Sequence, residues 1–116
     1  MITLTPQMKF FIAVQPVDFR CGIDGLSQIC KYKYEQDPLS GAIFLFRNRK
    51  GTSMKALVYD GQGFWLFQKR LSRGRFKYWP KSEGIARSLS SQQVSILLYN
   101  GDPLKSNIQP DWKQVA

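Results

Sequence analysis

Residues 42–67 read AIFLFRNRKGTSMKALVYDGQGFWLF, and this stretch decides the fold. Four short runs rich in β-forming residues lie within it or shortly after it: AIFLF (42–46), ALVY (56–59), FWLF (64–67) and FKYW (76–79). Each run is separated from the next by a segment that contains glycine, which supplies the positive φ that tight turns require. Connections of this length join antiparallel neighbours, so the sequence predicts a four-strand meander.

The segments before the meander predict one more strand and a first helix. FFIAV (10–14) is an apolar run of strand length, and Pro16 disfavours its continuation. Apolar residues then recur every three to four positions across residues 23–34, which is the spacing of an amphipathic helix. Pro38 ends this helix, because the residue before a proline avoids helical dihedral angles.

A second helix is predicted near the end of the chain. Ser90 is followed three positions later by Gln93, which is the pattern of a capping box. An apolar stripe with helical spacing follows and stops at Asn100-Gly101, where glycine favours a helix end.

These elements together predict a small α+β domain. Its sheet is mostly antiparallel, made of the N-terminal strand plus the four-strand meander, and it carries two helices. A chain of 116 residues has the length of one domain, which we expect to span residues 1–102. Residues 103–116 show no hydrophobic period and are expected to form a loosely ordered tail.

Composition removes several functional classes. The chain has no histidine, which excludes Ser-His-Asp and Cys-His catalysis and ordinary zinc sites with histidine ligands. Cys21 and Cys30 are too few for a disulfide framework, and we interpret them as small buried apolar residues. We expect no metal and no cofactor. No apolar run approaches the ~20 residues of a spanning helix, and the start lacks a signal-peptide pattern, so a cytoplasmic protein without a membrane partner is expected.

Positive charge is concentrated in the centre of the chain. The net charge is +9, and residues 41–80 carry nine cations against one acid, Asp60. We predict that these nine contact nucleic acid: Arg47, Arg49, Lys50, Lys55, Lys69, Arg70, Arg73, Arg75 and Lys77. Clustered Lys and Arg displace counterions condensed on phosphate, which favours a polyanionic partner, DNA in the first place. The alternative is a merely solvated basic surface.

The order of strand pairing decides whether these cations form one surface. In a meander they would lie in turns at strand ends, where long side chains are free to reach phosphate. The turns at residues 47–51 and 72–74 share one end of the sheet only for some pairing orders, and the sequence leaves that order open.

Aromatic side chains interleave with the cations. The run FWLF places bulky groups on successive residues and therefore on both faces of a sheet, so one face needs a cover or a partner. Trp65 and Tyr78 are our candidates for exposed aromatic contacts. Such rings could stack on unpaired bases or bind another protein.

Three stretches form a pattern beyond these local signals: DFRCGIDGL (18–26), DPLSG (37–41) and KRLSRGRF (69–76). In this order and spacing they resemble the TnpB-type accessory protein encoded by the second open reading frame of the insertion-sequence-66 family of bacterial transposable elements. The resemblance covers residues 8 to 102 approximately. It implies a non-catalytic helper of DNA transposition, encoded beside a separate transposase. One alternative is a protein-interaction module that binds that transposase or another accessory protein of the element.

The acidic residues offer a third hypothesis, a metal-dependent nuclease. Its candidate carboxylates are those of Asp18, Asp24, Asp37, Asp60 and Glu83. Two-metal chemistry needs carboxylates that converge on ions ~3.5–4 Å apart, whereas most of these acids occupy turn or helix-start positions. We therefore predict no catalytic residue.

Asp18 and Arg20 stand apart from the other charged residues. They lie in a glycine-containing loop just before the first predicted helix. They form either a ligand site or a buried ion pair that fixes the loop.

Overall fold

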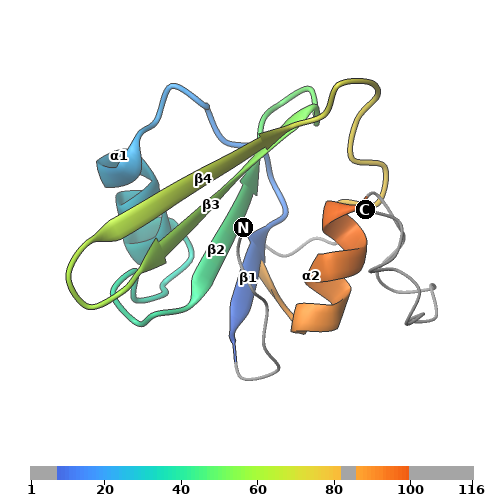
Figure 1. Ribbon diagram of the computed structural model, residues 1–116. Coiled ribbons are helices and arrows are strands. Elements are labelled where there is room, and N and C mark those ends of the chain that lie inside the picture. Colours follow the sequence, from blue (N-terminus) through green and yellow to red (C-terminus); the bar gives the residue numbers. More distant parts are fainter. Residues whose placement is uncertain (1–7, 82–85, 100–116) are drawn as a thin grey trace.

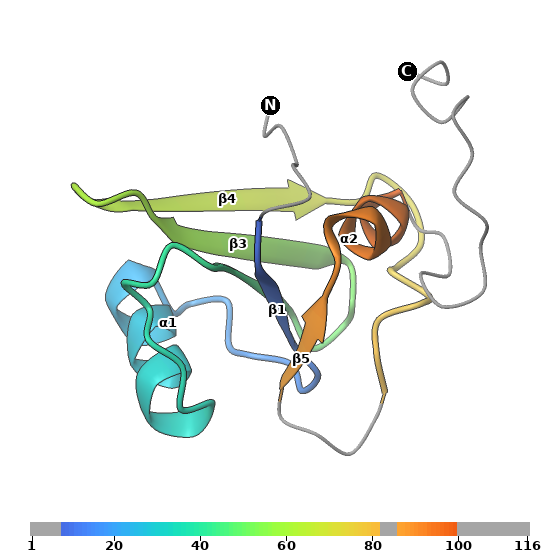
Figure 2. The same ribbon diagram turned by 90° about the horizontal axis from the view of Figure 1, so that it is seen from below.

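The computed structural model describes residues 8–81 and 86–99, which form one five-stranded sheet with a helix on each face (Figures 1 and 2). The strands are β1 (Phe10–Ala13), β2 (Ile43–Arg47), β3 (Ser53–Tyr59), β4 (Phe64–Arg70) and β5 (Ala86–Leu89). The helices are α1 (Ile23–Gln28), its π-helical continuation η1 (Ile29–Lys33), and α2 (Ser91–Leu98). The strand order is β4-β3-β2-β1-β5. The β1–β2 pair is parallel and the other three pairs are antiparallel, so the predicted α+β class is confirmed.

Strand β2 is buried on both faces, and this explains its uniformly apolar sequence. Ile43 and Leu45 pack in the cluster that includes α2, whereas Phe44 and Phe46 pack in the cluster that includes α1. Alternate residues of a strand point to opposite faces, so one short run supplies the centre of both cores. Figure 2 shows the two helices on opposite sides of the sheet.

The predicted fourth strand of the meander, residues 76–79, is wrong. This segment is a loop with a turn, and its Phe76 and Trp79 are buried against the face of the sheet that α2 also covers. The two rings meet edge to face at 5.9 Å, and the Trp79 indole N–H donates to the carbonyl oxygen of Ala13 at 2.7 Å. The aromatic residues of this run therefore mark burial, not strand pairing.

The fifth strand of the sheet is instead β5, which no pattern in the sequence indicates. It pairs antiparallel with β1, from Ala13 opposite Ala86 to Phe10 opposite Leu89. Its sequence, ARSL, is short and lacks the β-branched and aromatic residues that mark strands.

Both predicted helices are present. The first covers the expected residues, with its last turn widened into η1. The second begins at the predicted capping box: Gln93 N–H donates to Ser90 Oγ at 3.1 Å, and Ser90 N–H donates to Gln93 Oε1 at 3.0 Å. Its predicted stop at Asn100-Gly101, the domain boundary at 102 and the tail 103–116 lie outside the described residues. None of the described helices has the length and apolarity to cross a membrane.

Candidate nucleic-acid interface

Three loops leave the sheet at the same end. Strands β1, β2 and β4 run in the same direction, so the loops that follow them emerge together, along the upper edge in Figure 1. Backbone hydrogen bonds join these loops. Val17 N–H donates to the Arg47 carbonyl at 3.0 Å, and Leu71 N–H donates to the Thr52 carbonyl at 2.9 Å. We call this region, made of residues 14–22, 47–52 and 70–77, the basic end.

The two cation-rich turns touch one another at Gly51. Phe76 N–H donates to the Gly51 carbonyl at 2.8 Å. Gly51 has a φ of +72°, and a Cβ atom placed there would lie 3.7 Å from Cβ of Arg75. The positive φ therefore favours glycine at this position, whereas a Cβ atom would make only an ordinary van der Waals contact with the second turn. The pairing order that the sequence left open brings the two turns together.

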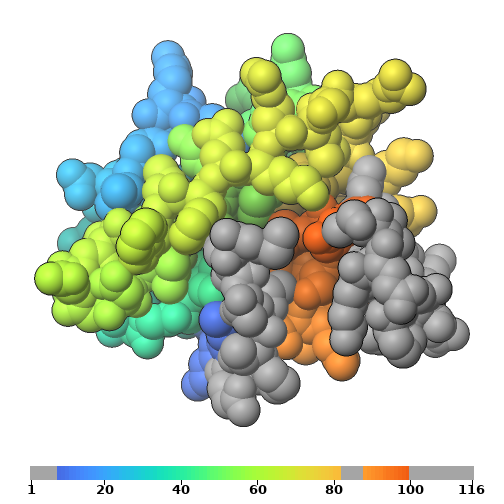
Figure 3. Space-filling view, in the orientation of Figure 1, coloured from blue at the N-terminus to red at the C-terminus, as the bar shows by residue number. Residues whose placement is uncertain are grey.

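The basic end displays several exposed cations. The exposed ones are Arg20, Arg49, Lys50, Arg70, Arg73, Arg75 and Lys77. Side chains of the green and yellow segments, which carry most of them, project from the top of the molecule in Figure 3. Of the acids that the structure describes, Asp18 alone belongs to these three loops, whereas Glu35, Asp37 and Asp60 lie in loops at the opposite end. Within residues 8–81 and 86–99, no ion pair neutralises Arg49, Lys50, Arg70 or Arg73.

Asp18 and Arg20 form an ion pair at the surface of the basic end. Arg20 Nη2 lies 2.7 Å from Asp18 Oδ2, Arg20 Nε lies 3.0 and 3.1 Å from the two carboxylate oxygens, and the Arg20 backbone N–H also donates to Oδ1. The guanidinium hydrogen bonds, followed by the backbone hydrogen bond, lower the pKa of Asp18 from 3.8 to about 2. The pair closes the loop on itself, but it is exposed and is not the buried pair that the sequence suggested as one alternative.

A hollow of about 390 Å³ lies next to this pair. It is lined by the loop 16–20 on one side and by Asn48 and Arg49 of the neighbouring turn on the other. The Arg49 charge also helps to lower the pKa of Asp18. Asp18 thus lies near two cations, Arg20 and Arg49, and its carboxylate already accepts hydrogen bonds from Arg20.

Lys55 is one of the predicted contact residues, but it lies inside the fold. Its side chain is only 8% exposed, and its ammonium group donates to the carbonyl oxygens of Phe19 at 2.9 Å and Cys21 at 3.2 Å. It holds the loop before α1 against β3, so we leave it out of the candidate interface.

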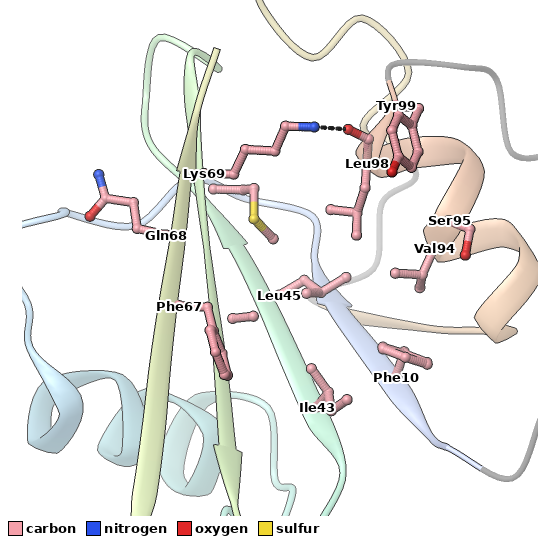
Figure 4. A pocket seen from close by; sticks show the side chains of 12 residues that line it. Phe10, Ile43, Leu45, Phe67, Gln68, Lys69, Val94, Ser95, Leu98 and Tyr99 are labelled. Atoms are coloured by element: carbon pink, nitrogen blue, oxygen red, sulfur yellow. Dashed lines mark hydrogen bonds between the residues drawn. The ribbon is translucent and has the colours of Figure 1, made fainter. Parts of the chain in front are cut away.

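Two further predicted cations are also engaged. Lys69 donates to the carbonyl oxygen of Leu98, at the C-terminal end of α2, and lies 5.1 Å from the centre of the Tyr99 ring (Figure 4). A cation at this position complements the negative end of the helix dipole. Arg47 folds over its own turn and donates to the carbonyl oxygens of Asn48 and Arg49 at 3.3 and 3.4 Å.

The two predicted aromatic contacts lie outside the basic end, and Tyr78 directly follows its last residue. Trp65 is 55% exposed and Tyr78 is 42% exposed. Trp65 stacks on Phe67 with ring centres 6.0 Å apart, and its indole N–H donates to Asp60 Oδ2 at 2.7 Å. Phe67, which no pattern in the sequence distinguishes, is also exposed and lies on the same face of β4 as Trp65.

An apolar groove of about 540 Å³ lies beside these rings (Figure 4). Phe67 and Lys69 of β4 form one wall, and Val94 and Leu98 of α2 form the other. The floor consists of residues of β1, β2 and β3. The groove exists because α2 packs over the β1 side of the sheet and leaves the same face of β3 and β4 open. No pattern in the sequence indicated where along the sheet the second helix would lie.

The described carboxylates do not converge. Asp18 binds Arg20, while Asp37 and Asp60 accept hydrogen bonds from backbone N–H groups of their own turns, which lower the pKa of Asp60. No group of three or more His, Cys, Asp or Glu residues that could hold a metal occurs in the described part of the chain. Glu83 lies outside the described residues.

Comparison with known proteins gives a family match over most of the chain. The model of the family described as IS66 Orf2-like protein matches residues 8–107. Two proteins of Sinorhizobium fredii (strain NBRC 101917 / NGR234) are similar over 91 residues each: uncharacterized protein y4hO is 43% identical, covering 78% of both chains, and uncharacterized protein y4jC is 34% identical, covering 78% of this chain and 77% of the relative. No solved structure matches the chain.

Proposed function

Because the chain belongs to the family of IS66 Orf2-like proteins, which suggests an accessory role in transposition, we propose that its basic end binds the phosphate backbone of DNA in that role. One observation carries this proposal. The exposed side chains of Arg49, Lys50 and Arg73 lie in two turns that are hydrogen-bonded to one another, at an end of the sheet where the one described acid is already paired.

The geometry suits a polyanion for electrostatic reasons. Duplex DNA carries about one negative charge per 1.7 Å of helix axis, so several cations on one surface are engaged simultaneously. Each phosphate contact releases condensed counterions, which makes binding favourable and dependent on salt. Contacts from turn residues to phosphate position the protein without reading the bases, so we expect little sequence preference.

The test replaces Arg49, Lys50 and Arg73 together with glutamine. The slope of log Kobs against log salt concentration should become shallower by roughly 0.9 for each duplex phosphate that the variant no longer neutralises. The slope is measured by fluorescence anisotropy with duplexes of unrelated sequence, and affinities for these duplexes should be similar.

A matched control removes the same charge from the opposite end. Lys9, Lys31 and Lys33 are exposed and lie near the other end of the sheet, so replacing them with glutamine changes the net charge equally. The control should keep the wild-type slope. Equal effects of the two triple variants would mean that net charge alone attracts DNA, and an unchanged slope in the first variant would rule out the basic end as the binding surface.

A protein-interaction role is the second candidate, favoured by the stacked and exposed rings of Trp65 and Phe67 beside an apolar groove. An interface of this kind buries apolar surface and therefore survives salt that abolishes phosphate contacts. Capture of the purified transposase of the element at high salt, abolished by Trp65→Ala, would support this function in place of DNA binding.

A further inference from the structure

The two edges of the sheet differ in a way that bears on self-association. One edge, β5, is four residues long. The other edge, β4, is seven residues long, and all seven pair with β3 in one continuous register, from Tyr59 opposite Phe64 to Ser53 opposite Arg70. An edge strand that is long and free of bulges is a ready template for another strand.

The hydrogen-bond pattern shows which groups of β4 are available. Asp60 N–H donates to the Gly63 carbonyl and Leu71 N–H donates to the Thr52 carbonyl, which fixes the alternation between β3 and β4. In an antiparallel pair, only every second residue bonds to its partner strand. The N–H and C=O groups of Phe64, Leu66, Gln68 and Arg70 therefore point away from β3, and no strand of the described chain pairs with them.

Most of the features that usually protect an edge are absent or engaged elsewhere, and Arg70, the cation of β4 without an ion pair in the described part of the chain, lies at its last position. Strand β4 contains no proline. Lys69, which could have kept other strands away, bonds instead to the end of α2. Trp65 and Phe67 stand exposed on the groove side of the strand, and their stacked rings extend the apolar surface to the edge itself.

From these observations we propose that β4 pairs antiparallel with β4 of a second copy of the chain, to give a continuous ten-stranded sheet. The register that uses all seven residues is centred on Phe67. It places the outward-pointing groups of Leu66 opposite those of Gln68 and the groups of Phe64 opposite those of Arg70, as ladder hydrogen bonds require. Phe67 then faces its counterpart at a position without hydrogen bonds, where cross-strand side chains approach most closely.

Charge favours this orientation over a parallel one. The cations of β4, Lys69 and Arg70, lie at one end of the strand, and Asp60 lies in the turn before the other end. Antiparallel pairing brings the cationic end of each copy beside the end that carries Asp60. Each chain carries a net charge of +9, so the remaining repulsion is long-ranged and screened by salt.

Sedimentation equilibrium of the full chain over a wide concentration range tests the proposal. We expect the mass to rise from the 13.4 kDa of the monomer to twice that value, and dimerisation to strengthen as salt is added. DNA binding by the basic end should weaken under the same change, so the two proposals give opposite salt responses.

Two variants locate the contact. Gln68→Pro removes an outward N–H group without removing a hydrogen bond to β3 and should weaken the dimer by about tenfold or more, whereas the matched Gln68→Ala should leave it unchanged. Phe67→Lys, at a position that is 37% exposed, sets two ammonium groups opposite one another and should also dissociate the dimer. Circular dichroism checks that both variants remain folded.

The outcomes separate this proposal from the proposed function. The Arg49, Lys50 and Arg73 triple variant should have a reduced DNA affinity and still dimerise. A chain that stays monomeric at all concentrations, or a dimer that both Gln68→Pro and Phe67→Lys leave intact, would overturn self-pairing through β4. Binding of β4 to the transposase by a chain that remains monomeric would have the same consequence.

Discussion

The ammonium group of Lys55 donates two hydrogen bonds to loop carbonyls and lies 4.8 Å from the centre of the Phe19 ring. In the sequence, this lysine looks like its basic neighbours. Only its position in the middle of β3, on the side that faces the loop before α1, distinguishes a structural cation from one that faces solvent. The same reasoning applies to Lys69, whose partner is the end of α2.

Replacing Lys55 with methionine should destabilise the protein by about 1–3 kcal/mol, because two partly buried carbonyl oxygens would have no donor. Urea unfolding measures this change. The control, Lys50→Met, alters an exposed side chain and should stay within about 0.5 kcal/mol of the wild type. If Lys50 proved to be the costlier substitution, the assignment of Lys55 to the fold would be wrong.

The pH response of Asp18 follows from its ion pair. Its pKa in the folded protein is about 2, below the ordinary value of 3.8, so folding favours the carboxylate form. The contribution of this pair to stability is therefore complete above 3.8 and disappears as the pH falls through about 2. NMR titration of the Asp18 carboxyl carbon should give a midpoint near 2, and Arg20→Gln should return it toward 3.8. A midpoint near the ordinary value in the wild type would show that the pair does not persist in solution.

At the scale of elements, the segment 76–79 explains where sequence reasoning fails. Its aromatic and β-forming residues are those of a strand, but Phe76 and Trp79 are three positions apart and point to the same core. A strand would have needed buried residues at alternate positions. In contrast, the three runs from 42 to 67 are bounded by turns of the correct chemistry and do form β2, β3 and β4.

The Trp79 indole is the contact that fixes this loop. Trp79→Phe removes its hydrogen bond to the Ala13 carbonyl and part of a buried ring, and should cost about 1–3 kcal/mol. The neighbouring Tyr78→Phe changes an exposed side chain and should have little effect. Thermal unfolding followed by circular dichroism compares the two variants. Similar melting temperatures for both would mean that the loop is not anchored through Trp79.

For the molecule as a whole, the sequence predicts the charge but not its arrangement. The basic end forms because β1 and β2 are parallel, so the loop after β1 reaches the same end as the turns after β2 and β4. Parallel pairing between strands separated by a helix is a long-range property that local patterns do not contain. The edge position of β4 depends on the strand order, and the groove depends on where α2 packs. Local patterns contain neither of these long-range properties. The cationic residues and the turns that carry them were therefore predictable from the sequence. That these turns meet at one end of the sheet depends on the strand topology and was not predictable.

The pairing of β1 with β5 has a consequence for how the chain is made. Phe10 aligns with Leu89, and β1 lies between β2 and β5 in the sheet. On the ribosome, β1 emerges first among these strands and can join β2 early, but its other side stays open until β5 has left the exit tunnel. Contacts between segments so distant in the chain form slowly. The speed of translation between β2 and β5 thus governs how long the nascent protein exposes an unpaired inner strand.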